Sequence, residues 1–140
     1  MREVTVKSIK LNRDLDGMLS EALERDLLVR IGWGRGGDEK PKKGEIGAIT
    51  HLPPKSRVLL LGNLGECAGA MNRGGTFTLR GSSTSMLGAF QQNGRIVVEK
   101  DVGDRLGYRM TGGAITVQGS AGDEAGAGIF GGTILVRGDR

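Results

Sequence analysis

The chain has 140 residues, of which 26 are glycine and only 3 are proline. Glycine is therefore far above its usual share of roughly 7%. Collagen needs a glycine at every third position and much proline, and a low-complexity linker of mixed glycine and proline also needs more proline than this chain has, so we exclude both classes. Hydrophobic residues make up 37% of the chain, which is enough for the core of one short domain.

The charge balance and the cysteine count further limit the class of protein and the partners that we expect. The formal net charge of +4 permits an acidic partner without requiring one. Proteins that bind single strands interleave aromatic and basic residues, and aromatic residues are only 4% of this chain, so we expect no nucleic-acid partner. The single cysteine, Cys67, excludes an internal disulfide and a cysteine-based zinc cluster.

The N-terminus does not resemble a targeting segment. Residues 1–10 alternate charged and β-branched residues and lack the apolar run of a signal peptide. No segment approaches the roughly 20 apolar residues of a membrane span. We therefore expect a soluble, cytoplasmic protein without a membrane partner.

Residues 1–56 predict a small α/β cap made of a strand, a helix, a strand and a flexible loop. Val4 and Val6 alternate with polar residues, as in a short strand. Apolar residues then recur three and four positions apart, which predicts a helix with Asn12 or Asp14 as its N-cap. This face consists of Leu11, Leu15, Met18, Leu19, Ala22 and Leu23. The run 27–31 predicts a buried strand, and the glycine- and charge-rich segment 32–44 predicts a loop.

The start of this loop, residues 32–37, has the glycine content of a dinucleotide-binding loop and follows a predicted strand. Such a loop needs a helix directly after it, whose N-terminus receives the pyrophosphate. Charged residues and Pro41 follow instead. We therefore expect a flexible loop and no bound cofactor, with a contact between the arginine–glycine segment and a partner or nucleic acid as the alternative.

From residue 57 the chain repeats every 19 residues, and positions that share one phase of the repeat form a column. Turn glycines are expected in four columns. These are Gly69, Gly88, Gly107 and Gly126; Gly75, Gly94, Gly113 and Gly132; Gly65, Gly103 and Gly122; and Gly81, Gly119 and Gly138. Thr84 and Lys100 interrupt the last two columns, so the coil that contains them should be wider or less regular.

The apolar residues keep the same period. They are Phe77, Ile96, Ile115 and Ile134 in one column, and Leu79, Val98, Val117 and Val136 in another, with Val58 and Leu60 one unit earlier. A unit of this length with one short strand cannot bury its own apolar face, but stacked units can. Parallel stacking pairs every strand with the next turn of the chain. Glycine permits the sharp corners between faces.

The sequence therefore predicts an all-β fold, a parallel β-helix of four to five coils over residues 57–140. We expect it to form one structural unit with the cap at residues 1–56. The other repeat fold considered is the leucine-rich solenoid, which has periods of 20 to 29 residues. That fold needs several leucines per unit and an asparagine ladder, and this chain has neither.

Two repeats, 103–119 and 122–138, carry a further signature. Both contain Gly-x3-Gly-x5-Gly, and both continue as Gly-Gly-x-Ile-x-Val. By this signature residues 58–140 resemble the GXGXG domain family. The family includes the C-terminal domain of the large subunit of glutamate synthase, its stand-alone archaeal counterparts, and the C subunit of formylmethanofuran dehydrogenase.

The resemblance implies a right-handed β-helix that is structural rather than catalytic, because the chemistry of these enzymes resides in other domains or subunits. It implies a non-catalytic part of an oxidoreductase complex, with other subunits as partners and without catalytic, cofactor-binding or metal-binding residues. A helix-bearing N-terminus before the repeats favours the stand-alone archaeal glutamate-synthase type. A protein like the C subunit of formylmethanofuran dehydrogenase is the close alternative, and a stand-alone homo-oligomeric binding module is the alternative from another class.

One set of residues could carry metal chemistry. Glu66, Asp104 and Asp123 share a column, with Ser85 between them. Stacked carboxylates could hold Ca²⁺, which binds several oxygens. The calcium-binding nonapeptide of β-rolls is absent, and an aspartate that bonds its own backbone in a turn is the plainer interpretation.

Three other sets of residues have a structural interpretation that we weigh against a functional one. His51 and Cys67 could form a nucleophile–base pair, although a lone histidine and a lone thiol are more often structural. Ser82, Ser83 and Ser85 have no second histidine to act with, so we interpret them as turn residues. A basic stripe of Arg80, Lys100 and Arg137, with Arg95 nearby, could dock a partner, but a solvated face is the default.

The last repeat ends in a strand whose outer N–H and C=O groups have no further repeat to pair with. Such an edge invites pairing with another chain, and terminal repeats normally need a polar cap. The sequence therefore predicts self-association, or a partner subunit, at the open C-terminal coil.

Overall fold

The computed structural model describes residues 3–6, 28–32, 52–61, 63 and 66–138. The expected helix over residues 11–23 lies outside the described residues, as do loop residues 33–44, His51 and Gly65. The described part of the chain contains no helical segment with the length and apolar character needed to cross a bilayer.

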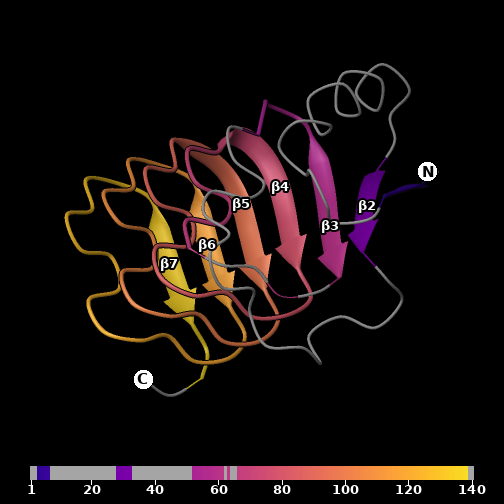
Figure 1. Cartoon of the computed structure of the whole chain (residues 1–140). Helices are drawn as coiled ribbons and strands as arrows, with labels where there is room; N and C mark the ends of the chain where they lie inside the picture. Colours follow the sequence, from indigo (N-terminus) through magenta and orange to yellow (C-terminus); the bar gives the residue numbers. More distant parts are fainter. Residues whose placement is uncertain (1–2, 7–27, 33–51, 62, 64–65, 139–140) are drawn as a thin grey trace.

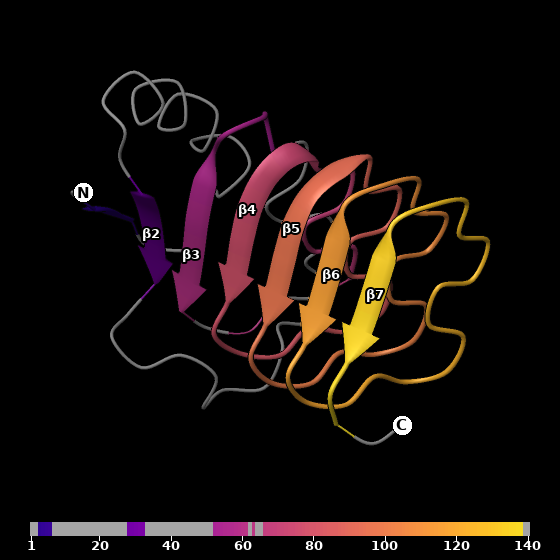
Figure 2. The ribbon, with the colours of Figure 1, turned by 180° about the vertical axis from the view of Figure 1, so that it is seen from behind.

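Seven strands form one parallel sheet in which the strands follow one another in chain order. They are β1 (Glu3–Val6), β2 (Leu28–Gly32), β3 (Arg57–Leu61), β4 (Arg73–Leu79), β5 (Asn93–Val98), β6 (Ala114–Val117) and β7 (Thr133–Val136). After each of the later strands the chain crosses behind the sheet and returns to start the next strand beside the last one (Figures 1 and 2). The result is a right-handed β-helix, the hand that parallel crossovers almost always adopt.

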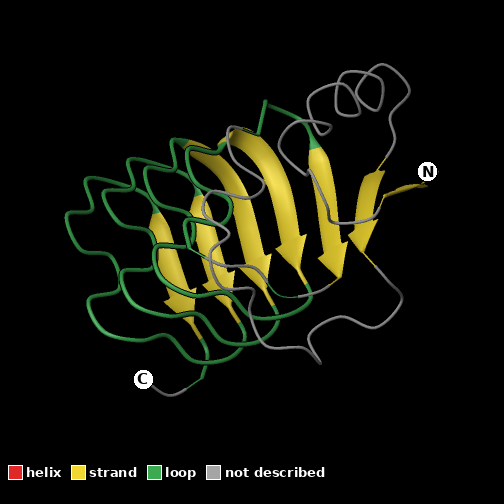
Figure 3. Ribbon diagram, in the orientation of Figure 1, coloured by secondary structure: helices red, strands yellow, loops and turns green. Residues whose placement is uncertain are grey.

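The described residues contain strands and loops and no helix (Figure 3). Val58 lies opposite Phe77, Phe77 opposite Ile96, and so on through Ile115 to Ile134, each 19 positions after the last. The all-β prediction and its 19-residue period are therefore confirmed over this region.

Strands β1 and β2 belong to the same sheet, but their paired residues are more than 19 positions apart in the chain. Val4 pairs with Val29, 25 positions later, and Val29 pairs with Val58, 29 positions later. The short strands expected near Val4 and over residues 27–31 are thus present as β1 and β2. Their longer connections explain why the 19-residue repeat could not be followed back beyond β3.

The inward positions of the strands form the core. Ile96 and Val98 on β5, and Val117 on β6, are fully buried, and each such side chain contributes roughly 1.5–3 kcal/mol. Leu87 and Leu106 on the opposite wall close the interior. The whole cluster consists of Val29, Leu52, Val58, Leu60, Ala68, Phe77, Leu79, Leu87, Ile96, Val98, Val102, Leu106, Met110, Ile115, Val117 and Ala121.

A left-handed glycine lies at the start of each of the last three strands: Gly94 is the second residue of β5, and Gly113 and Gly132 directly precede β6 and β7. Gly113 shows why glycine is needed there. Its φ is +83°, and a Cβ there would lie 2.6 Å from the carbonyl oxygen of Gly94 in the preceding coil. Two buried side chains stabilise the corners at the starts of β4, β5 and β6. Asn72 accepts hydrogen bonds from the N–H groups of Gly74 and Gly75, and Gln91 donates from Nε2 to the carbonyl oxygens of Gly94 and Ala114.

The expectation of an irregular coil around Thr84 and Lys100 is wrong. Gly103 N–H donates to the Thr84 carbonyl and Gly119 N–H donates to the Lys100 carbonyl, both at 3.2 Å. Gly122 N–H donates to the Gly103 carbonyl at the same distance. Thr84 and Lys100 have no positive φ, so a side chain is accommodated there. The register shift lies elsewhere, between Arg73 and Thr76 of β4.

Candidate functional site

The corner opposite the sheet has an unusual backbone that repeats in every coil. Cys67, Met86, Arg105 and Glu124 are non-glycine residues with φ between +56° and +62°, and they form one column. A left-handed residue other than glycine costs roughly 1–2 kcal/mol. Hydrogen bonds between coils offset this cost, because Cys67 N–H donates to Ser85 O, and Arg105 N–H donates to Asp123 O, both at 2.9 Å.

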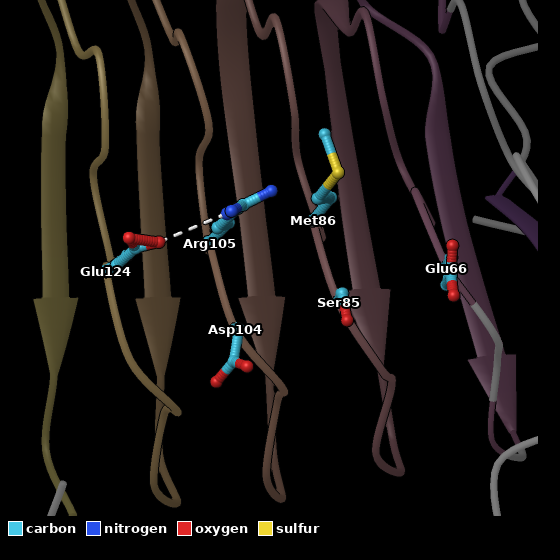
Figure 4. Close-up of a pocket in the computed structure, with 6 residues that line it drawn as sticks. All are labelled: Glu66, Ser85, Met86, Asp104, Arg105 and Glu124. Atoms are coloured by element: carbon cyan, nitrogen blue, oxygen red, sulfur yellow. Dashed lines mark hydrogen bonds and ion pairs between the residues drawn. The ribbon is translucent and has the colours of Figure 1, made fainter.

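This corner borders a surface hollow of about 260 Å³. Its lining residues are Glu66, Ser85, Met86, Asp104, Arg105 and Glu124. Figure 4 shows the six side chains spread along successive coils rather than converging on one point. Only Arg105 and Glu124 are joined, with 3.2 Å between Nε and Oε2. Both side chains are more than half exposed, so the pair contributes roughly 0.2–1 kcal/mol.

The acidic column does not gather into a metal site among the described residues, which contain no cluster of three or more histidine, cysteine or acidic side chains that could hold an ion. Asp104 Oδ1 accepts the backbone N–H of Asp123 at 2.7 Å. Asp104 therefore bonds the backbone, as the plainer interpretation expected, but that of the next coil instead of its own turn. Asp123 and Glu66 are exposed.

Cys67 is half-buried beside Glu66. Burial, and then the Glu66 carboxylate, raise the pKa of its thiol above the ordinary value of 9.0. A thiol with a raised pKa is a poor nucleophile near neutral pH, since the thiolate is the reactive form. Its supposed partner, His51, lies outside the described residues.

The serines do not share one role. Ser83 is buried and its hydroxyl donates to the Thr84 carbonyl at 3.4 Å, whereas Ser85 borders the hollow.

Ser82 belongs to a side-chain ladder that the sequence alone did not reveal. Asn63 Oδ1 accepts Ser82 N–H at 2.6 Å, Ser82 Oγ accepts Asp101 N–H at 3.2 Å, and Asp101 Oδ1 accepts Ser120 N–H at 2.8 Å. Short polar side chains at the 19-residue interval were the signal that could have indicated it.

The basic stripe is interrupted. Arg80 and Arg137 share a column, but Glu99 stands between them and pairs with Arg80, with 3.3 Å from Nε to Oε2. Arg95 is exposed on the outer face of β5. The face thus carries both signs of charge, which is typical of a solvated surface.

The C-terminal coil exposes apolar side chains at positions that earlier coils bury. Ile129 is 41% exposed, whereas Met110 in the same column is fully buried. Ile134 and Val136 are only partly buried, unlike their counterparts Ile115 and Val117. Phe130 (79% exposed) and Leu135 (46%) project from the same coil. Within the part of the chain that the structure describes, the core is therefore open to solvent at the coil that contains β7.

The chain was compared with protein-family models, curated proteins and solved structures, and no match was found in any of the three. The resemblance to the GXGXG family therefore stays a prediction from the repeat signature.

Proposed function

We propose that the chain is a non-catalytic β-helix subunit or domain of an oxidoreductase complex, of the type of the glutamate synthase GXGXG domain. The signature of the repeats 103–119 and 122–138 supports the family. The fold supports a structural role, since this β-helix is the architecture that the resemblance implies.

The main support for a structural role is that the inward side chains and several polar side chains of each coil contact the neighbouring coils. The inward strand positions fill the interior, with Ile96, Val98 and Val117 at 0% exposure. Side-chain oxygens of Asp101 and Asp104 bond the backbone of the next coil. The coil interior is therefore packed rather than hollow, and its outer faces are what a partner would contact.

Two alternatives remain. A protein like the C subunit of formylmethanofuran dehydrogenase shares the same repeat signature. A stand-alone homo-oligomeric module is favoured by a different observation, the exposed apolar side chains of the C-terminal coil.

Affinity purification from the native cell separates these proposals. The glutamate-synthase type predicts a stoichiometric flavin or iron–sulfur protein in the eluate, and the formylmethanofuran dehydrogenase type predicts a molybdopterin protein. Recovery of this chain alone would favour the homo-oligomeric module. Turnover by the purified chain that disappears in Cys67→Ser but persists in Ser83→Ala would contradict a non-catalytic role.

A further inference from the structure

The outer edge of β7 has backbone groups available for pairing. Thr133 N–H donates back to Gly113 O at 3.0 Å, and Arg137 N–H donates back to Val117 O at 2.8 Å. Successive residues of a strand direct their N–H and C=O groups to opposite sides. Ile134 and Val136 therefore direct theirs away from β6, and within the described residues no strand pairs with this edge.

The edge also lacks the features that keep edge strands apart. Charged residues and proline commonly protect an exposed edge, and β7, Thr-Ile-Leu-Val, contains neither. Its inward side chains, Ile134 and Val136, are partly buried, and Leu135 on the outer face is 46% exposed.

We propose that a second copy of this chain pairs with β7 in antiparallel orientation, with Leu135 of both copies at the two-fold axis. In this register Ile134 lies opposite Val136 of the other copy, and the two residues exchange both backbone hydrogen bonds. The symmetry-related pair, Val136 opposite Ile134 of the other copy, also exchanges two hydrogen bonds. The outward N–H and C=O groups of both residues are then satisfied. The two sheets join into one across the dimer.

The strand is complementary to itself in this register. Residues opposite each other share the same face, so Ile134 and Val136 extend the core across the interface and Leu135 contacts Leu135. Arg137 lies opposite Thr133, so no like charges meet. A two-fold axis at Ile134 would place Gly132 in the pairing, and its φ of +93° is not extended. A two-fold contact also closes the assembly, whereas a head-to-tail contact of β7 with β1 would build a filament.

This inference depends on the coil geometry and not on the proposed function. The first experiment uses the whole chain with Leu135→Cys, and Thr116→Cys as the matched control. Thr116 is in the same column one coil earlier, so its two copies would lie about 15 Å apart across three strand spacings. A disulfide needs Cα atoms within about 7 Å. Both variants retain Cys67, and the unaltered chain measures the cross-linking that Cys67 alone gives.

Under mild oxidation we expect a reducible covalent dimer with Leu135→Cys, and no more than the background with Thr116→Cys. Sedimentation of the unaltered chain should give twice its mass of 14.8 kDa. Leu135→Arg, which brings two like charges together at the axis, should weaken the dimer at least about tenfold while leaving the circular dichroism spectrum unchanged.

Each other outcome overturns the proposal. A monomer at all concentrations excludes the second copy, and filaments would indicate head-to-tail contact. Equal cross-linking of the two cysteine variants would place the contact elsewhere. A dimer that Leu135→Arg does not weaken would mean that β7 is not at its centre.

Discussion

At the scale of single residues, Gly113 and Gly126 separate two reasons for a glycine. Both have left-handed backbones, with φ of +83° and +76°. A Cβ at Gly113 would collide with Gln91 Nε2 and with the backbone of Gly94 and Asn93 in the preceding coil. At Gly126 the nearest atom to a Cβ is Ile134 Cδ1 at 3.6 Å, an ordinary contact. Only Gly113 therefore combines backbone strain with lack of space.

We predict that Gly126→Ala lowers the free energy of unfolding by about 1–2 kcal/mol, the cost of a left-handed alanine. Gly113→Ala should cost a further ~1–3 kcal/mol, because its Cβ overpacks the corner. Urea denaturation of the two variants measures the difference. Equal losses would mean that the neighbouring coil imposes no steric constraint at Gly113.

Cys67 gives a prediction about pH. Because burial and Glu66 disfavour the thiolate, alkylation by iodoacetamide should increase with pH around a midpoint above 9.0, the ordinary pKa of the thiol. Glu66→Gln should lower this midpoint but keep it above 9.0, since burial is the larger cause. With a pKa raised by folding, the thiol contributes stability that is complete below pH 9.0 and is lost as the pH increases through the folded pKa.

The unfolded chain in urea is the control for this titration, since it lacks both the burial and the fixed Glu66 neighbour. A midpoint in the folded protein at or below that of the unfolded chain would contradict the prediction.

At the scale of elements, the ladder of Asn63, Ser82, Asp101 and Ser120 links coils through side chains instead of strands. The side-chain oxygens of Asn63, Ser82 and Asp101 each accept the backbone N–H of the residue 19 positions later. The corner after each strand is therefore held to its neighbour by side chains in addition to backbone hydrogen bonds, such as those from Ser83 N–H to Asp101 O at 3.0 Å and from Val102 N–H to Ser120 O at 2.9 Å.

Asp101→Ala removes one acceptor and leaves Ser120 N–H without it, so we expect a loss of about 0.5–1.5 kcal/mol in unfolding free energy. Asp101→Asn keeps a carbonyl oxygen at the same place and should retain most of the stability. Chemical denaturation of both variants, together with amide hydrogen exchange at Ser120, tests this. Slow exchange at Ser120 in Asp101→Ala would show that the ladder is not needed at this position.

The elements that repeat were those that the sequence could predict. Strands β3 to β7 follow from the 19-residue period, because an inward apolar residue in one coil requires one in the next. The left-handed backbone at Met86 and Arg105 had no signal, since glycine is the usual residue with positive φ. Buried Asn72 and Gln91 also escaped prediction. Their column continues as Met110, so polarity gave no periodic pattern, and the corner carbonyls that they bond were visible only in three dimensions.

The candidate site was predicted less well than the fold. The shared column of Glu66, Asp104 and Asp123 was recognised, but a column brings residues into line along the coils without making them converge. Whether a carboxylate faces an ion or the next backbone N–H depends on its side-chain direction, which the period does not determine. The bond from Asp123 N–H to Asp104 decided this point.

At the scale of the whole molecule, the β-helix is a stack of interchangeable coils. From Thr76 of β4 onward, successive coils pair in the same 19-residue register, β4 to β5, β5 to β6 and β6 to β7. Stability in such a stack is approximately a sum of coil and interface contributions. One coil should therefore be removable if the register of the remaining coils is kept.

The most direct test removes residues 96–114, one 19-residue period, so that Arg95 is followed by Ile115 in the same phase. Removal of residues 96–113 is the matched control. This deletion is one residue shorter than the period, and a shift of one residue reverses which side chains of a strand face the core. We predict cooperative thermal unfolding, followed by circular dichroism, for the 19-residue deletion at a lower midpoint than the full chain, and no cooperative transition for the 18-residue deletion. Two deletions that unfold alike would contradict the stacked-coil account.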